Sequence, residues 1–144
     1  MEPSEHQPRQ ASCVAIGGRG MLIEGPTGSG KSGLALSLID RGARFVGDDG
    51  ILLHEQDGRL IARPHPRIRG LLEVRNLGLL RFPCLDETPI AILVRLDESA
   101  PRYIEGPESI EIEGIALPMV RLWPHGGPLA IKAQLALERF GLAT

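Results

Sequence analysis

The stretch GPTGSGKS at residues 25–32 determines how the rest of this chain is interpreted. It has the form G-x-x-x-x-G-K-S, in which backbone N–H groups surround nucleotide phosphates, the lysine reaches the outer phosphates and the serine hydroxyl ligates Mg²⁺. An apolar run precedes it and a helical pattern follows it, which is the context that a phosphate loop requires. We therefore predict that nucleotide is bound by Gly25, Pro26, Thr27, Gly28, Ser29, Gly30, Lys31 and Ser32.

The composition narrows the class of protein. Of the 144 residues, 42% are hydrophobic and only 3% aromatic, so we expect one domain with an aliphatic core. The net charge of −2 argues against a nucleic-acid partner, and no apolar run approaches the ~20 residues of a membrane span. The start, MEPSEHQPRQ, lacks the apolar region of a signal peptide, which favours a cytoplasmic protein. We expect residues 1–10 to be a disordered tail and residues 11–144 to be a single P-loop domain.

Hydrophobic periodicity and turn residues predict more strands than helices. We expect helices at residues 32–42 and 128–141, each closed by a glycine. Strands are predicted at 13–17 and 21–25 around the turn GGRG, in ARFVGDDG, in a hairpin over 51–64 and at 89–97. Residues 68–82 indicate a helical turn followed by extended chain, and residues 101–124 indicate edge strands and loops. P-loop proteins usually alternate strand and helix, so this pattern predicts a strand-rich α/β fold.

Two carboxylates, Asp48 and Asp49, end the short strand that follows the first predicted helix. In a P-loop fold this strand end can lie beside the phosphate loop, where a carboxylate can reach Mg²⁺ or accept the proton of an attacking hydroxyl. Asp-Asp-Gly is also good turn chemistry, so an exposed turn is the alternative interpretation.

A second apolar strand, AILVRLDE at residues 91–98, also ends in two carboxylates. In many ATPases such a strand supplies a Mg²⁺ ligand and a carboxylate that activates water, and those roles would fall to Asp97 and Glu98. Arg95 within the strand and the Ser-Ala-Pro exit indicate an ordinary strand end instead.

Glu73 and Arg75 alternate with aliphatic residues in the segment LLEVRNLG. One interpretation is a solvent-exposed face of a strand or helix. The other is that these residues lie near phosphates, where they would serve as a metal ligand and a charge clamp.

Three blocks, GPTGSGKS, RGARFVGDD and LLEVRNLG, occur here in order and at the correct spacing, and together they resemble the catalytic domain of HPr kinase/phosphorylase. The chain is similar to the short, single-domain form of this family known from alphaproteobacteria. The resemblance implies a P-loop domain of the phosphoenolpyruvate carboxykinase-like type, with a strand-rich mixed sheet and few helices. It also implies ATP-dependent phosphorylation of a serine of HPr or an HPr-like phosphocarrier, in regulation of carbohydrate metabolism through the phosphotransferase system. The family also runs the reverse removal, with phosphate as acceptor and pyrophosphate as product.

The resemblance assigns roles to matching residues. It implies catalytic roles for Lys31, Asp48, Asp49 and Arg75, and Mg²⁺ coordination by Ser32 and Glu73. Within this set, Asp49 would accept the serine proton during phosphorylation and return a proton during removal, with Asp48 beside it near the metal. Members of the family are often hexameric, so the resemblance leaves a homo-oligomer open.

The chain departs from the family pattern at three places. Gln10 stands where the family has a catalytic histidine, and glutamine cannot exchange a proton near neutral pH. Asn76 stands where the signature has glycine, and HGGP at residues 125–128 replaces a segment that contains arginine. For the family's other late catalytic arginine, Arg102 is the candidate considered. We therefore expect the forward kinase reaction to be better supported than the phosphorylase reaction, which stays open as a second activity. A nucleotide-binding sensor of reduced catalysis and a small P-loop ATPase are the alternatives.

Overall fold

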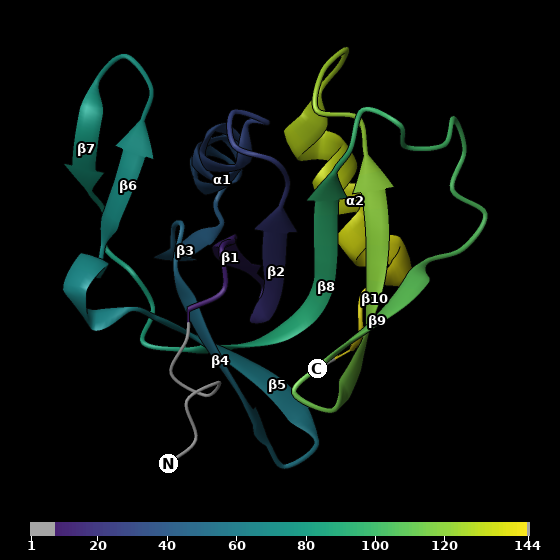
Figure 1. Cartoon of the computed structure of the whole chain (residues 1–144), viewed down its shortest axis with the longest axis horizontal. Helices are drawn as coiled ribbons and strands as arrows, with labels where there is room; N and C mark the ends of the chain where they lie inside the picture. Colours follow the sequence, from purple (N-terminus) through teal and green to yellow (C-terminus); the bar gives the residue numbers. More distant parts are fainter. Residues whose placement is uncertain (1–7, 144) are drawn as a thin grey trace.

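A mixed β-sheet organises residues 8–143, which are the part of the chain described by the computed structural model (Figure 1). Most of the expected tail thus falls on residues 1–7, outside the described residues. The main sheet has the strand order β3-β1-β2-β8-β10-β9, and β4 joins it through β5, which pairs with β8. Its strands are β1 (Ser12–Ile16), β2 (Arg19–Glu24), β3 (Arg44–Gly47), β4 (Ile51–Gln56), β5 (Arg59–Pro64), β8 (Thr88–Leu96), β9 (Glu108–Ile112) and β10 (Ile115–Leu122).

The predicted first hairpin and first helix are confirmed. Strands β1 and β2 pair in antiparallel register. The tight turn between them places Gly17 and Gly18 at φ values of 59° and 80°, a left-handed conformation that glycine adopts without steric cost. Helix α1 (Lys31–Asp40) begins at the lysine of the GPTGSGKS motif and is followed by Arg41 and Gly42, whose φ of 106° is also left-handed.

The strand directions bring the phosphate loop and the aspartate pair to the same edge of the sheet. Strand β2 runs parallel to β8, which in turn runs parallel to β10. Strand β3 is antiparallel to β1, as β2 is, so β3 also runs in the direction of β2. Ligands of open α/β sheets bind beyond the carboxyl ends of such strands, which here carry the phosphate loop after β2 and Asp48 after β3.

One expectation about the strands is corrected. Residues 101–124 were expected to contain only edge strands and loops, but β10 lies between β8 and β9. Of the two strands in this region, only β9 is at an edge of the sheet. Proline is normally confined to edge strands because it cannot donate a backbone hydrogen bond. Pro118 is tolerated in β10 because pairing with β8 begins one residue later, at Met119.

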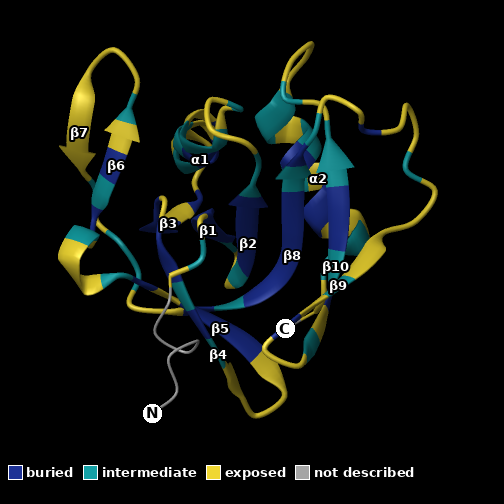
Figure 2. Cartoon of the chain, viewed as in Figure 1, coloured by how far each residue is buried: buried dark blue, intermediate teal, exposed yellow. Residues whose placement is uncertain are grey.

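Helices cover one face of the strands β1, β2, β8 and β10. The β4–β5 hairpin, which is joined to the sheet through β8, packs against the opposite face. In β2, Met21 and Ile23 pack in a cluster with α1 and α2 (Leu129–Phe140), whereas Leu22 packs with residues of β4 and β5. Strand β8 is buried along most of its length (Figure 2), which explains its continuous apolar sequence. Among residues 8–143, no helix has the length and apolarity needed to cross a membrane.

The ambiguous segment 68–82 forms a hairpin that is separate from the main sheet. A short 3₁₀ helix (Pro66–Ile68) leads into β6 (Leu71–Val74), which pairs antiparallel with β7 (Gly78–Arg81) as a two-stranded sheet. Strand β7 is exposed along its whole length (Figure 2). The expected extended chain is confirmed, whereas the helical turn ends at Ile68, at the start of the segment, and the two strands pair as a hairpin that was not predicted. This hairpin carries Glu73 and Arg75 to the phosphate loop.

Candidate functional site

The phosphate loop connects the end of β2 to the start of α1. Within it, Gly28 and Gly30 have φ values of 83° and 104°, a conformation that turns successive N–H groups inward as an anion-binding nest. The Ser29 N–H bonds to the Pro26 carbonyl at 3.0 Å and closes a turn inside the loop. The open N–H groups and the helix dipole at the start of α1 make this end of the helix favourable for phosphate.

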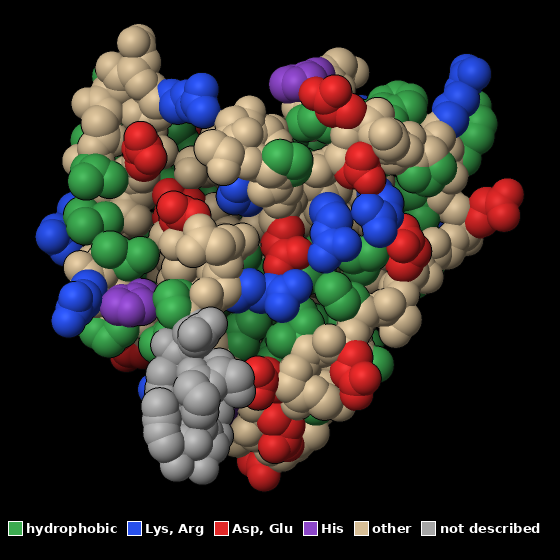
Figure 3. Space-filling view, viewed as in Figure 1, with side chains coloured by type: hydrophobic (Ala, Val, Ile, Leu, Met, Phe, Trp, Pro, Cys, Tyr) green, Lys and Arg blue, Asp and Glu red, His purple; other side chains and the backbone are tan. Residues whose placement is uncertain are grey.

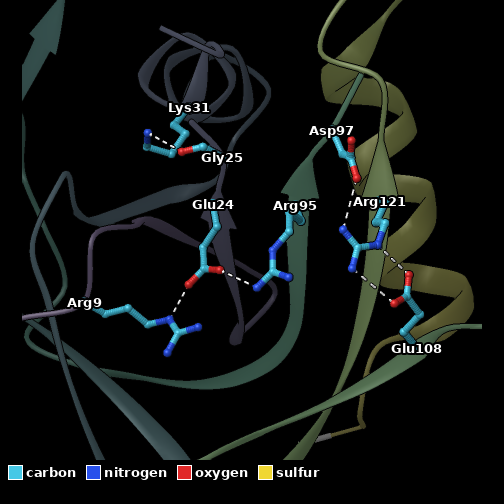
Figure 4. A network of polar contacts seen from close by, with 8 residues as sticks. All are labelled: Arg9, Glu24, Gly25, Lys31, Arg95, Asp97, Glu108 and Arg121. Carbon is cyan, nitrogen blue, oxygen red and sulfur yellow. Dashed lines mark hydrogen bonds and ion pairs between the residues drawn. The ribbon is translucent and has the colours of Figure 1, made fainter. Parts of the chain in front are cut away.

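Lys31, the lysine of the motif, lies against the loop that it follows. Its Nζ donates to the Gly25 carbonyl at 2.9 Å (Figure 4). A Cβ placed at Gly25 would lie 2.5 Å from the Ser29 Oγ and 3.1 Å from the Leu96 Cβ, so a larger residue there would force these neighbours to shift. The ammonium therefore sits at the mouth of the nest, within reach of a phosphate bound there.

Asp48, at the end of β3, meets the serine of the phosphate loop. The Ser32 Oγ donates to the Asp48 carboxylate and lies 3.0 Å from each of its two oxygens. The carboxylate also accepts from the backbone N–H of Glu73 at 3.4 Å, which ties β6 to the same point. Asp48 is buried, with 7% of its surface exposed, so its hydrogen bonds compensate for the loss of water.

One cavity of about 300 Å³ brings together every charged residue assigned to the site from the sequence. Its charged lining residues are Lys31, Asp48, Asp49, Glu73 and Arg75. Asp49 is exposed and has a φ of 58°, a strained backbone conformation of the kind that concentrates at functional sites. Arg75 reaches over the loop, since its Nη2 lies 3.5 Å from the position that a Cβ on Gly28 would occupy.

Asn76 has a physical reason to replace the signature glycine. Its φ of 77° lies in the left-handed region, at the turn between β6 and β7. Asparagine adopts this conformation more readily than other side-chain-bearing residues do. The departure therefore preserves the turn that positions Glu73 and Arg75.

A second cavity, of about 730 Å³, lies on the other side of the phosphate loop. At its base, the Glu24 carboxylate is held between Arg9 and Arg95 (Figure 4). Burial alone would raise the pKa of the Glu24 carboxyl, but hydrogen bonds from Arg9 and Arg95 lower it below its ordinary value. Figure 3 shows acidic and basic side chains side by side in the middle of the face that is turned toward the viewer. Sequence reasoning missed this network, although Glu24 is a carboxylate in an apolar strand directly before the loop.

The remaining candidates do not line the cavity that contains Lys31 and Ser32. Gln10 and His125 line the larger cavity rather than the one with the aspartate pair. Arg102 lies over the Tyr103 ring, 5.5 Å from its centroid, beside α2. Arg102 therefore lines neither cavity.

Asp97, the Mg²⁺ ligand of the ATPase interpretation, is occupied by other contacts. Its carboxylate accepts from the Ser99 N–H at 2.8 Å. It also accepts from the Arg121 Nη1 at 3.0 Å (Figure 4). These hydrogen bonds, led by that of Ser99, lower the pKa of the Asp97 carboxyl. Asp97 and Glu98 line the larger cavity, so the ATPase interpretation gains no support from the geometry.

The donor set around Asp48 suits a hard divalent cation. Ser32 offers a hydroxyl, and Asp48 and Glu73 offer carboxylates, all on the same cavity as the phosphate loop. Mg²⁺ prefers such oxygen ligands and usually binds through one or two carboxylates together with substrate phosphates. The residues present thus fit a magnesium–nucleotide complex.

A phosphate loop between β2 and α1, at the edge of a strand-rich mixed sheet with few helices, makes this chain a P-loop α/β domain. A family model described as the HPr Serine kinase C-terminal domain matches residues 3–102. The chain belongs to this family.

Relatives support the same family. The chain is 31% identical over 128 residues to the HPr kinase/phosphorylase of Mycoplasma mycoides subsp. mycoides SC, covering 76% of this chain and 41% of that protein. It is 34% identical over 122 residues to the HPr kinase/phosphorylase of Streptococcus thermophilus, covering 76% of this chain and 40% of that protein. The chain thus spans about two fifths of the length of these curated relatives.

A solved structure confirms the predicted fold class. The structure of the Hpr(Ser) kinase/phosphatase from Coxiella burnetii matches with a TM-score of 0.81 and 28% sequence identity. The match covers 92% of this chain and 96% of that chain. The strand-rich mixed sheet with two helices is consistent with the P-loop domain of the phosphoenolpyruvate carboxykinase-like type.

Proposed function

We propose that this domain is an ATP-dependent protein-serine kinase that phosphorylates HPr or an HPr-like phosphocarrier. The names of its relatives support this assignment. The observation that carries it is the single cavity lined by the phosphate loop, Asp48, Asp49, Glu73 and Arg75. These are the components that phosphoryl transfer needs, because such catalysis depends mainly on positioning and on stabilisation of charge.

The proposed reaction assigns a task to each residue. The acceptor serine oxygen attacks the γ-phosphorus, the bond from that phosphorus to the β–γ bridging oxygen breaks, and ADP leaves. Asp49 accepts the serine proton, which its exposed position on the cavity allows. Lys31 and Arg75 balance the phosphate charge as the bond breaks.

The metal of this proposal is Mg²⁺, held by Ser32 and Glu73 with Asp48 beside them. When bound, it would neutralise charge on the phosphate oxygens. Asp48 keeps the Ser32 hydroxyl in place through the hydrogen bonds already described.

The reverse, phosphorylase reaction is a weaker proposal for this chain. Gln10 replaces the family histidine and lines the larger cavity, whereas Asp48 and Asp49 line the other. A glutamine amide cannot relay a proton between water and an aspartate near neutral pH. We propose that the kinase direction dominates.

The test is a transfer assay with mass readout. Purified protein is incubated with ATP, Mg²⁺ and the HPr encoded in the same genome, and the carrier is then analysed by intact-mass and peptide mass spectrometry. Gain of one phosphoryl group on one serine supports the kinase. Nucleotide binding without any transfer would instead identify a nucleotide-binding sensor, and ATP hydrolysis without a modified carrier would identify an ATPase.

A further inference from the structure

A buried serine on β1 holds the aspartate that meets the phosphate loop. Ser12 is fully buried, with 0% of its surface exposed, and its Oγ donates to the Asp48 Oδ1 at 2.6 Å. Among the described residues, the buried polar or charged side chains are Ser12, Asp48 and Thr88. Two of these three are therefore bonded to each other, directly beneath the candidate site.

The hydrogen bond from Ser12 is one of three that the Asp48 carboxylate accepts from different elements. Three donors from three different elements converge on it, namely the Ser12 hydroxyl on β1, the Ser32 hydroxyl on α1 and the Glu73 N–H on β6. Ser32 and Glu73 belong to the cavity and would meet a metal or nucleotide there. Ser12 does not line that cavity, so it is the donor that stays in place whatever the cavity binds.

Loss of the Ser12 hydroxyl would leave the buried Oδ1 atom without its shortest hydrogen bond. Bonds to charged groups are stronger than neutral ones, and they are more directional in a dry interior. The carboxylate would then be free to rotate away from Ser32. The effect would fall on the part of the site proposed to hold the metal, because Asp48 bonds to the Ser32 hydroxyl and to the backbone N–H of Glu73, which holds the strand that carries the Glu73 carboxylate.

We propose that Ser12 is a positioning residue, whose hydroxyl locks the Asp48 carboxylate in the orientation that organises Ser32 and Glu73 for the magnesium–nucleotide complex. This inference rests on the proposed function. Ser12 acts through Asp48 and does not touch the nucleotide or the acceptor serine.

The decisive comparison is Ser12→Val with Ser12→Thr. The two side chains have the same shape and both suit a strand, and only threonine keeps the hydroxyl. Calorimetry measures ADP binding with and without Mg²⁺ for each variant. We expect Ser12→Val to bind magnesium–ADP about tenfold more weakly than Ser12→Thr, the equivalent of one charge-assisted hydrogen bond. Without Mg²⁺ the two variants should bind ADP equally.

Thr88→Val is the matched control, because it also removes a buried hydroxyl. Thr88 lies at the start of β8 and its Oγ1 contacts the Pro89 carbonyl, outside the cavity of the site. This variant should keep wild-type magnesium–ADP binding. If Ser12→Val does not fold, Ser12→Ala is compared with Ser12→Thr in the same way.

Two results separate this inference from the proposed function. If Ser12→Val and Ser12→Thr bind magnesium–ADP equally and the wild-type protein phosphorylates HPr, the role of Ser12 is overturned and the proposed kinase function is supported. A tenfold difference in magnesium–ADP affinity, together with no phosphoryl transfer by the wild type, would support the role of Ser12 and overturn the kinase.

Discussion

Ser32 and Asp48, which lie sixteen residues apart in the chain, meet with 3.0 Å between the serine Oγ and each carboxylate oxygen. The pair connects the start of α1 to the end of β3, so it links the phosphate loop to the aspartate pair. It also separates the roles of the two aspartates. Asp48 is buried and fully engaged, whereas Asp49 is exposed beside it and free to face an incoming substrate.

Replacement of Lys31 by alanine should weaken ATP binding and abolish turnover. An ammonium held against the outer phosphates makes charge-assisted hydrogen bonds worth roughly 1.5–3 kcal/mol each, and loss of one corresponds to about a 10–150-fold loss of affinity. Isothermal titration with ATP and the transfer assay measure the two effects. Lys132→Ala is the control, because Lys132 is the other lysine of the chain and lies on α2 near Trp123. Unchanged affinity and turnover in Lys31→Ala would refute the assignment.

Replacement of Glu73 by glutamine should raise the Mg²⁺ concentration needed for transfer by about tenfold, because an amide oxygen is a weaker ligand than a carboxylate. The fold should be intact, since Glu73 is exposed. The measurement is a Mg²⁺ titration of transfer at saturating ATP, with circular dichroism to check the fold. Glu111→Gln, on the exposed edge strand β9, is a matched control. A wild-type titration curve for Glu73→Gln would show that this residue is not a metal ligand.

Replacement of Asp49 by asparagine should remove most transfer to HPr while magnesium–ATP still binds. The amide keeps the shape of the side chain but cannot accept the serine proton, and a positioned base contributes typically ~10²–10⁴-fold. Asp97→Asn should have little effect on transfer, because Asp97 bonds to Ser99 and Arg121 at the other cavity. One assay that follows phospho-HPr and ATP binding compares both variants. Normal transfer by Asp49→Asn and loss of transfer in Asp97→Asn would overturn the role of Asp49 and move the catalytic carboxylate to Asp97.

Glu24 should contribute stability that depends on pH. Arg9 and Arg95 lower the pKa of its carboxyl, so the native state favours the ionised form. This contribution is fully present above the ordinary pKa of 4.5 and is lost as the pH falls through the lowered native value. Glu24→Gln should therefore cost roughly 1–3 kcal/mol at pH 7 and less at pH 3. Urea unfolding of both proteins at the two pH values gives the comparison, and a constant difference would exclude this linkage.

Local signals in the sequence predicted much of this fold. The turn GGRG, the apolar period of residues 32–42 and the pair Asp57-Gly58 each act within a few residues, and each predicted element is present. The pair adopts left-handed φ values of 55° and 79°, as a tight hairpin turn requires.

Non-local contacts could not be predicted in this way. The hydrogen bond from Ser12 to Asp48 spans 36 residues, and nothing near Ser12 in the sequence marks it. The interior place of β10 depends on parallel pairing with β8, which the prolines of this region concealed. For the candidate site, the three sequence blocks indicated the residues of one cavity. The Arg9–Glu24–Arg95 network was missed because it joins three distant segments.

Segment 68–82 was ambiguous for a physical reason. Leu77 and Leu79 read as apolar core positions, yet 72% and 67% of their surfaces are exposed. Hydrophobic periodicity assumes that apolar residues are buried, and here that assumption fails.

The β6–β7 hairpin defines a separate unit of local opening. Its strands pair with each other as a sheet of their own, and a bond from the Phe82 N–H to the Gly70 carbonyl at 2.8 Å closes its base. Strand β7 is exposed along its whole length and, among the described residues, neither strand pairs with the main sheet, so the amide protons of the hairpin should exchange with deuterium before those of β2 and β8. Since Glu73 lies on this hairpin, binding of magnesium–ATP would slow that exchange. The rate of amide exchange at β6 thus measures whether magnesium–ATP has bound at the site. This measurement needs neither a carrier protein nor enzymatic turnover.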